Sequence, residues 1–337
     1  MTVMWLARVG VGVAAATLCS LGPASAQAPG RMVRIGLLDY GTPNPSADAR
    51  WSALRAQLRD LGYLEGRNVA FEPRWANGHV ERLPGLAAEL VEGKKVDVVV
   101  TATTEAAVAV KRLNTSIPIV TATGGGDPVA RGLVASLARP GGNVTGVISL
   151  NSDLTGKRLE LVKEMLPHAT RVGVLRDPDN RASILSARDA AGAAKSLRIV
   201  VHTFDVRRGD VRPGGLDDAF LAMKRAQVEA VMLTVNTPFI ADGRRLAELA
   251  LSHRLPMMAP TREYVEAGAL VSYGTDYLDL FRRAAGYVDR ILNGARPGDL
   301  PIEQPTKFEL VINLKTSAAL RLVIPSPVLG RADRLLQ

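Results

Sequence analysis

Short apolar runs rich in β-branched residues alternate along the chain with longer stretches in which apolar residues recur every three or four positions. The short runs predict buried strands, and the longer stretches predict helices that cover them. Strands are predicted at residues 33–38, 68–72, 96–100, 117–120, 144–148, 172–175, 199–204, 230–233, 256–259, 269–272 and 310–312. Helices are predicted at residues 51–61, 80–91, 105–113, 159–166, 183–197, 216–225, 243–252 and 278–292. This alternation is typical of α/β proteins with parallel sheets.

A Gly- and Pro-rich cluster at residues 139–143 divides the pattern into two similar halves. Each half begins with a strand, a polar loop and a helix, and then repeats that order. The sequence therefore predicts two Rossmann-like lobes in tandem, each built on a parallel sheet.

The first 26 residues differ from the rest of the chain. Arg8 precedes an apolar run at residues 9–18, and small residues follow at 23–26. This order predicts a secretory signal peptide, residues 1–26, cleaved after Ala26. A membrane helix is the alternative, but Gly and Pro interrupt the run before it reaches the length of a good span. We therefore expect a periplasmic protein.

Cysteine and charge narrow the possible chemistry. The one cysteine, Cys19, lies in the predicted signal peptide, so the mature chain would have no disulfide, zinc–thiolate site or cysteine nucleophile. The full chain has 42 basic and 33 acidic residues, and removing the signal peptide lowers its formal charge from +9 to +8. No Lys/Arg run is interleaved with aromatic residues, so we expect no nucleic-acid partner.

Motifs for catalysis are absent from the sequence. The four histidines lie far apart and lack metal-ligand spacing, and no Gly-x-Ser-x-Gly or Walker motif occurs. The Gly-rich segment at residues 124–128 is better interpreted as a tight turn than as a phosphate-binding loop. We therefore expect no enzyme activity, no cofactor and no metal. A secreted enzyme on a two-lobed α/β scaffold remains the alternative.

Small hydroxyl, amide and acidic residues recur just after the predicted strands. In open α/β sheets, ligands bind outside the carboxyl ends of the strands, where such side chains converge. The same residue types also cap helices at these places, so any single one is as well explained by capping. The set contains Thr42, Thr101, Thr103, Thr104, Thr123, Asp127, Asn180, Asn236, Thr237 and Thr275.

Aromatic residues make up only 4% of the chain, so each one in a polar loop is of interest. Tyr40 follows the first predicted strand and is the best candidate for stacking on a ligand, and Tyr264 is a second candidate. Trp51 and Phe281 lie on apolar helix stripes, which predicts a place in the core. The predicted ligand-binding residues are Tyr40, Thr42, Thr103, Thr104, Thr123, Asp127, Asn180, Asn236, Tyr264 and Thr275.

Several longer motifs resemble a known family. They are GDPV at residues 126–129, SLARPGGNVTG at 136–146, REYVEAG at 262–268 and EQPTKFELVIN at 303–313. Together they resemble the ABC transporter substrate-binding proteins that include tryptophan- and tyrosine-type uptake proteins. The similarity runs from about Arg34 to the C-terminus.

This resemblance implies a type I periplasmic binding protein fold with a hinge of three crossing segments. It places residues 31–146 plus 275–303 in lobe one and residues 147–274 plus 304–337 in lobe two. It also implies a small-molecule ligand, an amino acid or a small organic acid, bound between the lobes of a monomer that docks on ABC permease subunits at the inner membrane. The effector domain of a transcription repressor shares the architecture, but the predicted signal peptide occupies the place of its DNA-binding helices.

Overall fold

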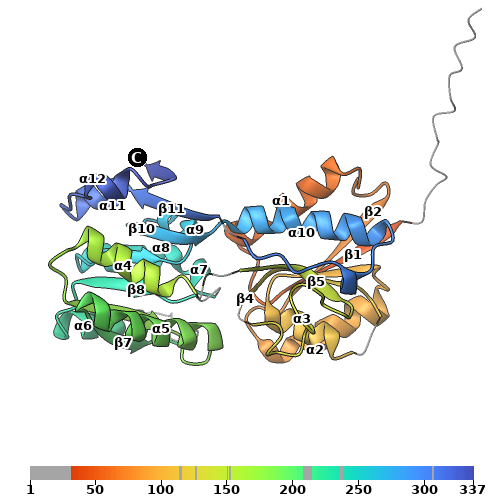
Figure 1. Ribbon diagram of the computed structural model, residues 1–337, viewed down its shortest axis with the longest axis horizontal. Coiled ribbons are helices and arrows are strands. Elements are labelled where there is room, and N and C mark those ends of the chain that lie inside the picture. Colours follow the sequence, from red (N-terminus) through yellow and green to blue (C-terminus); the bar gives the residue numbers. More distant parts are fainter. Residues whose placement is uncertain are drawn as a thin grey trace, which may run out of the picture. The chain divides into compact units, whose positions relative to one another are not determined.

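The computed structural model describes most of the chain (Figure 1). The described residues are 32–113, 116–125, 127–149, 151, 153–207, 215–235, 238–305 and 307–337. None of the helices in these segments is long and apolar enough to cross a membrane. The predicted signal peptide, together with the candidate residues Asn236 and Thr237, lies outside the described residues.

The first half of the chain builds a five-stranded, fully parallel sheet with the order β2-β1-β3-β4-β5. Two buried clusters pack against the sheet, one including α1 and α10 and the other including α2 and α3. Its strands are β1 (Val33–Asp39), β2 (Val69–Trp75), β3 (Val98–Thr101), β4 (Ile119–Gly125) and β5 (Val144–Ser149). The helices are α1 (Pro45–Asp60), α2 (Leu83–Ala88), α3 (Thr104–Lys111) and α10 (Tyr277–Leu292).

The second sheet has seven strands in the order β12-β11-β10-β9-β8-β6-β7. All of its pairs are parallel except β10 with β11, because the chain leaves the sheet after β10 and returns in the opposite direction. Its strands are β6 (Arg171–Arg176), β7 (Val200–Asp205), β8 (Ala230–Leu233), β9 (Met257–Ala259), β10 (Val271–Thr275), β11 (Phe308–Asn313) and β12 (Arg334–Leu336).

Helices also cover both faces of the second sheet. The elements α4, α5 and α12 contribute to one buried cluster, and α6, α8 and α9 contribute to the other. The helices are α4 (Thr155–Met165), α5 (Arg181–Leu197), α6 (Gly215–Arg225), α7 (Pro238–Ala241), α8 (Gly243–Ser252), α9 (Arg262–Glu266), α11 (Leu314–Ala319) and α12 (Ser326–Leu329). The predicted α/β class with two mainly parallel sheets is confirmed.

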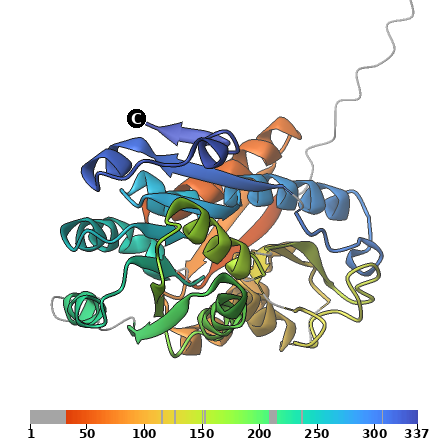
Figure 2. The ribbon, with the colours of Figure 1, turned by 60° about the vertical axis from the view of Figure 1, so that its left-hand side comes forward.

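Helix α10 follows a strand of the second sheet but packs on the first. It lies along α1 in both views (Figures 1 and 2), and its residues Leu280, Phe281 and Val288 belong to the first core. The chain passes from one sheet to the other at residues 149–155, 275–277 and 303–308. Near the last crossing, Glu303 pairs with Val147 of β5.

Proline explains three of the differences between the observed and the predicted elements. The helix predicted at residues 80–91 is divided into a 3-10 turn (Val80–Arg82), α2 and a π turn (Glu89–Gly93). Pro84 lies in the first turn of α2, which is where a residue without an N–H fits best in an α-helix. Likewise β4 and β9 begin after Pro118 and Pro256, since proline cannot donate to the sheet.

Candidate functional site

A cavity of about 610 Å³ is lined by residues from both sheets and from the segments that cross between them. The first sheet contributes loops after β1, β3 and β4, and the second contributes the loop after β6 and the start of α5. Ser149, Asn151 and Tyr277 come from the crossing segments. The cavity therefore lies at the carboxyl ends of parallel strands, where α/β folds bind ligands.

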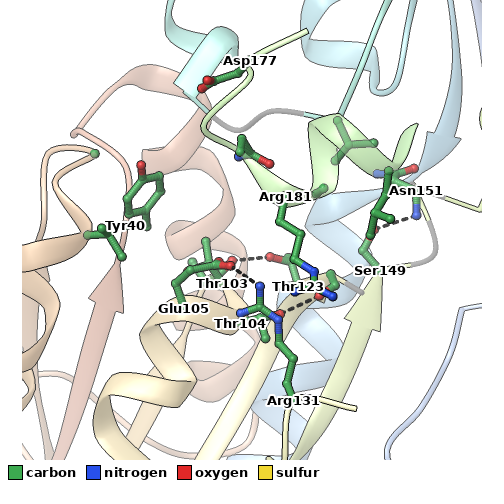
Figure 3. A pocket seen from close by; sticks show the side chains of 18 of the residues that line it. Tyr40, Thr103, Thr104, Glu105, Thr123, Arg131, Ser149, Asn151, Asp177 and Arg181 are labelled. Carbon is green, nitrogen blue, oxygen red and sulfur yellow. Dashed lines mark hydrogen bonds and ion pairs between the residues drawn. The ribbon is translucent and has the colours of Figure 1, made fainter. Parts of the chain in front are cut away.

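Six of the ten predicted site residues line this cavity: Tyr40, Thr103, Thr104, Thr123, Asp127 and Asn180. Figure 3 shows Tyr40, Thr103 and Thr123 around the same space. Thr42, Tyr264 and Thr275 are not among the lining residues, and Asn236 lies outside the described residues. Tyr264 is only 1% exposed because α9 packs it into a core of the second sheet, and Thr275 is buried at the end of β10.

The polar residues that line the cavity also have structural partners. Thr103 and Asn180 cap α3 and α5, and each side-chain oxygen accepts a hydrogen bond from the backbone N–H three residues later. The Thr104 hydroxyl donates to the Gly125 carbonyl oxygen at 2.7 Å, and Asp127 Oδ1 accepts from the N–H groups of Val129 and Ala130. Capping thus fixes the walls of the cavity whether or not these groups contact a ligand.

Arg50 is a lining residue that the sequence analysis missed. It lies on α1, and its side chain is on the buried face between Ala47 and Leu54, so only 4% of it is exposed. Its guanidinium carbon is 5.8 Å from the centre of the Tyr277 ring. A cation on an otherwise apolar helix stripe was the signal that could have revealed it.

The other charged groups at the cavity are more exposed or already paired. Arg131 forms an ion pair with Glu105 at 3.0 Å, which Figure 3 shows, and Asp179 pairs with Arg207 at 3.3 Å. Arg181, at the start of α5, is exposed. Within the described part of the chain, no group of three His, Cys, Asp or Glu side chains could hold a metal ion.

Asn151 connects two of the crossing segments. Its side-chain oxygen accepts from the Thr275 N–H at 2.9 Å, and its amide nitrogen donates to the Tyr277 hydroxyl at 3.1 Å. Burial raises the pKa of Tyr277, whereas the hydrogen bond from Asn151 and the charge of Arg50 oppose that rise. Arg50, Tyr277 and Asn151 therefore form a chain of contacts from the cavity to the crossings.

Arg158 forms hydrogen bonds to the same crossing segments and is not among the residues that line the cavity. Its guanidinium donates to the carbonyl oxygens of Asn151 and Tyr273, both at 2.7 Å, and to Asn151 Oδ1 at 3.1 Å. The side chain is 1% exposed, and burial lowers its pKa to about 10. A planar, multiply donating group at this position fixes the relative positions of backbone segments far apart in the sequence.

The two sheets, the crossing segments and the cavity define the class of the protein as a type I periplasmic binding protein fold. The chain belongs to the family of ABC transporter substrate-binding proteins, whose model matches residues 42–336. The family resemblance seen in the sequence is thereby confirmed.

Similar proteins include a curated one and two solved structures. A tyrosine-binding protein of Clostridioides difficile (strain R20291) is 28% identical over 277 residues, which cover 82% of this chain and 78% of that protein. The structure of an ABC domain in complex with L-Trp from Streptococcus pneumonia has a TM-score of 0.78 and 25% identity, covering 90% of this chain and all of that one. A conserved domain protein from Vibrio cholerae has a TM-score of 0.80 and 28% identity, covering 90% of this chain and all of that one.

Proposed function

We propose that this chain is the exported solute-binding component of an ABC importer and binds an amino acid or a small organic acid in the cavity. The main support for the proposal is the cavity, which is lined by residues from both sheets. The chain also belongs to a family of substrate-binding proteins of ABC transporters. The tyrosine-binding relative and the L-Trp complex support an amino acid as the ligand class.

In this proposal, binding works by shifting a conformational equilibrium. A ligand that contacts both walls of the cavity gains its full set of contacts only when the two sheets approach each other. The crossing segments held by Asn151 and Arg158 act as the hinge. Permease subunits at the inner membrane would then distinguish the loaded, closed monomer from the empty one.

A ligand screen on the exported, purified protein tests this function. L-Amino acids, organic acids, sugars and polyols are each added, and the unfolding midpoint is measured. We expect one class to raise the midpoint, because a ligand that binds only the folded state stabilises it. Calorimetry should give one ligand per chain, and mass spectrometry should recover the compound unchanged. Turnover of the compound, or no shift from any class, would contradict the proposal.

The proposed periplasmic location depends on residues 1–26 and needs a separate test. We expect these residues to direct a fused reporter enzyme, active only outside the cytoplasm, into the periplasm. Replacement of Leu18 by Arg should retain the reporter in the cytoplasm, because a charge interrupts the apolar run of the signal. Equal export of both fusions would count against a signal peptide.

A further inference from the structure

Arg50 is a buried cation that forms no ion pair within the described part of the chain. Its guanidinium nitrogen Nη1 is inaccessible to solvent and has no hydrogen-bond partner. Among the described residues, no carboxylate oxygen lies within 4.0 Å of the guanidinium. Among the described residues, the Tyr277 ring is the aromatic group within cation–π distance of the guanidinium.

Two acidic side chains of the first half of the chain, Asp39 and Glu105, have partners other than Arg50. Asp39, at the end of β1, is 1% exposed, but its two oxygens accept from the Trp51 indole N–H at 3.0 Å and the Gly41 N–H at 2.8 Å. Glu105 is paired with Arg131. Both of these carboxylates are therefore engaged with other donors.

Such a guanidinium is costly to bury. Arginine remains charged at all physiological pH values and has five N–H donors, so removing it from water without a partner opposes folding. A neutral side chain of similar size would fill the same space at lower cost. Because Arg50 lines the cavity, an anion inside the cavity can pair with its guanidinium.

We propose that Arg50 anchors the carboxylate of the ligand, and that the cavity selects compounds with a free carboxylate over their neutral analogues. This inference rests on the proposed function and specifies the chemical group that the site recognises. The guanidinium offers paired N–H donors that match the two oxygens of a carboxylate. The guanidinium carbon is 5.8 Å from the centre of the Tyr277 ring, within the range of a cation–π interaction.

Paired ligands test the inference on the unmodified protein. Calorimetry would compare L-tyrosine, L-tryptophan and benzoate with L-tyrosinamide, L-tryptophanamide and benzamide, which have similar shape but no carboxylate. We expect at least one acid to bind, and its amide to bind at least about 10-fold more weakly. Equal affinity for acid and amide overturns the inference, as does binding of inorganic phosphate, sugars or polyols with no binding of any acid in the panel.

Variants at Arg50 test the residue itself. In R50Q and R50M, the affinity for the acid should fall by about 10- to 100-fold, and the preference for acid over amide should disappear. R55Q is the matched control, since Arg55 is on the same helix, stacks on Phe71 and does not line the cavity. It should retain the affinity and the preference. Unchanged acid binding in R50M overturns the inference.

The stability of the empty protein separates loss of binding from loss of folding. We expect R50M without ligand to unfold at the same or a higher temperature than the unmodified protein, because methionine removes a buried unpaired charge and keeps most of the volume. A large decrease in the unfolding midpoint of both R50M and R50Q would show that Arg50 serves the fold, and would overturn the inference.

Glu263 provides the decisive control. Its Oε2 is also buried without a partner, and both Glu263 and Arg50 influence the pKa of Tyr277. In the alternative hypothesis, Arg50 pairs with Glu263 in another conformation and only shapes the site. E263Q and R50Q would then break the same ion pair, and both would weaken binding of the acid and the amide equally. We expect E263Q to retain the preference for the acid.

Binding of sugars alone would leave the proposed solute-binding function intact while refuting a carboxylate anchor.

Discussion

At the scale of single residues, close packing at the crossings makes one glycine indispensable. A Cβ added to Gly274 on β10 would lie 1.9 Å from the Pro260 carbonyl oxygen and 2.6 Å from Asn151 Oδ1. We expect G274A to lower the free energy of unfolding by at least about 2 kcal/mol, because rigid backbone cannot move away. Urea denaturation measures this change.

Gly286 is the matched control within α10. A Cβ there would have no neighbour within 4 Å, so G286A should raise the free energy of unfolding by about 0.5–1 kcal/mol through helix propensity alone. Similar effects of the two substitutions would mean that the packing around Gly274 is not as tight as described.

A tyrosine on α10 gives stability a dependence on alkaline pH. The Tyr287 hydroxyl donates to the Pro301 carbonyl oxygen at 2.6 Å, and burial raises its pKa from 10.0 to about 12. Well below pH 10 the folded and unfolded states both keep the Tyr287 proton, so the stabilisation linked to this raised pKa is fully present. Between pH 10 and about 12 the unfolded chain releases its proton first, and stability decreases.

Y287F removes this contribution. The free energy of unfolding, measured at intervals from pH 9 to 12, should therefore fall less steeply for Y287F than for the unmodified protein. Parallel curves would contradict the account. The comparison isolates Tyr287 because Tyr264 and Tyr277, whose pKa values are also raised by burial, are present in both proteins.

At the scale of elements, the crossing segments depend on the geometry of one guanidinium. In R158K, a single ammonium group cannot reach the carbonyl oxygens of Asn151 and Tyr273 together, so buried acceptors lose their partner. We expect the free energy of unfolding to fall by about 2–4 kcal/mol. R181K, at an exposed position, should change it by less than about 0.5 kcal/mol in the same denaturation assay. Equal changes in the free energy of unfolding for R158K and R181K would contradict a structural role of Arg158.

The longer helices and most strands were predictable because they are encoded in local periodicity, whereas α7, α9, α11, α12 and β12 were not predicted. Continuous apolar runs such as that of β3 indicate a strand covered on both faces, and the stripe of α10 repeats at helical spacing. Trp51 and Phe281, both predicted to lie in the core, are buried there with ring centres 4.8 Å apart. Tyr264 was harder to place, because local sequence does not show which face of the short helix α9 meets the core.

Arg50 was missed for a related reason. Arginine on a surface helix usually extends to solvent, so its place on an apolar stripe is a weak signal by itself. Its burial follows from α10, which begins at Tyr277, more than 200 residues further along the chain, and packs along α1. Long-range packing of this kind is not encoded in periodicity. The polar loop residues were found because strand ends are local features.

At the scale of the whole molecule, the proposed function couples ligand binding and domain movement in one equilibrium. The cavity is lined from both sheets, and the chain of contacts from Arg50 through Tyr277 to Asn151 leads from the cavity to the crossings. A ligand anchored at Arg50 would favour the conformation in which the walls are closest. The ratio of its affinities for the closed and open conformations sets how far the equilibrium shifts.

Small-angle X-ray scattering tests this claim most directly. The purified protein is measured alone and then saturated with the carboxylate that raises its unfolding midpoint most. R50Q is measured at the same ligand concentration. We predict that the radius of gyration decreases when the unmodified protein is saturated and stays constant for R50Q. An unchanged radius of gyration in the saturated, unmodified protein would contradict closure around the ligand.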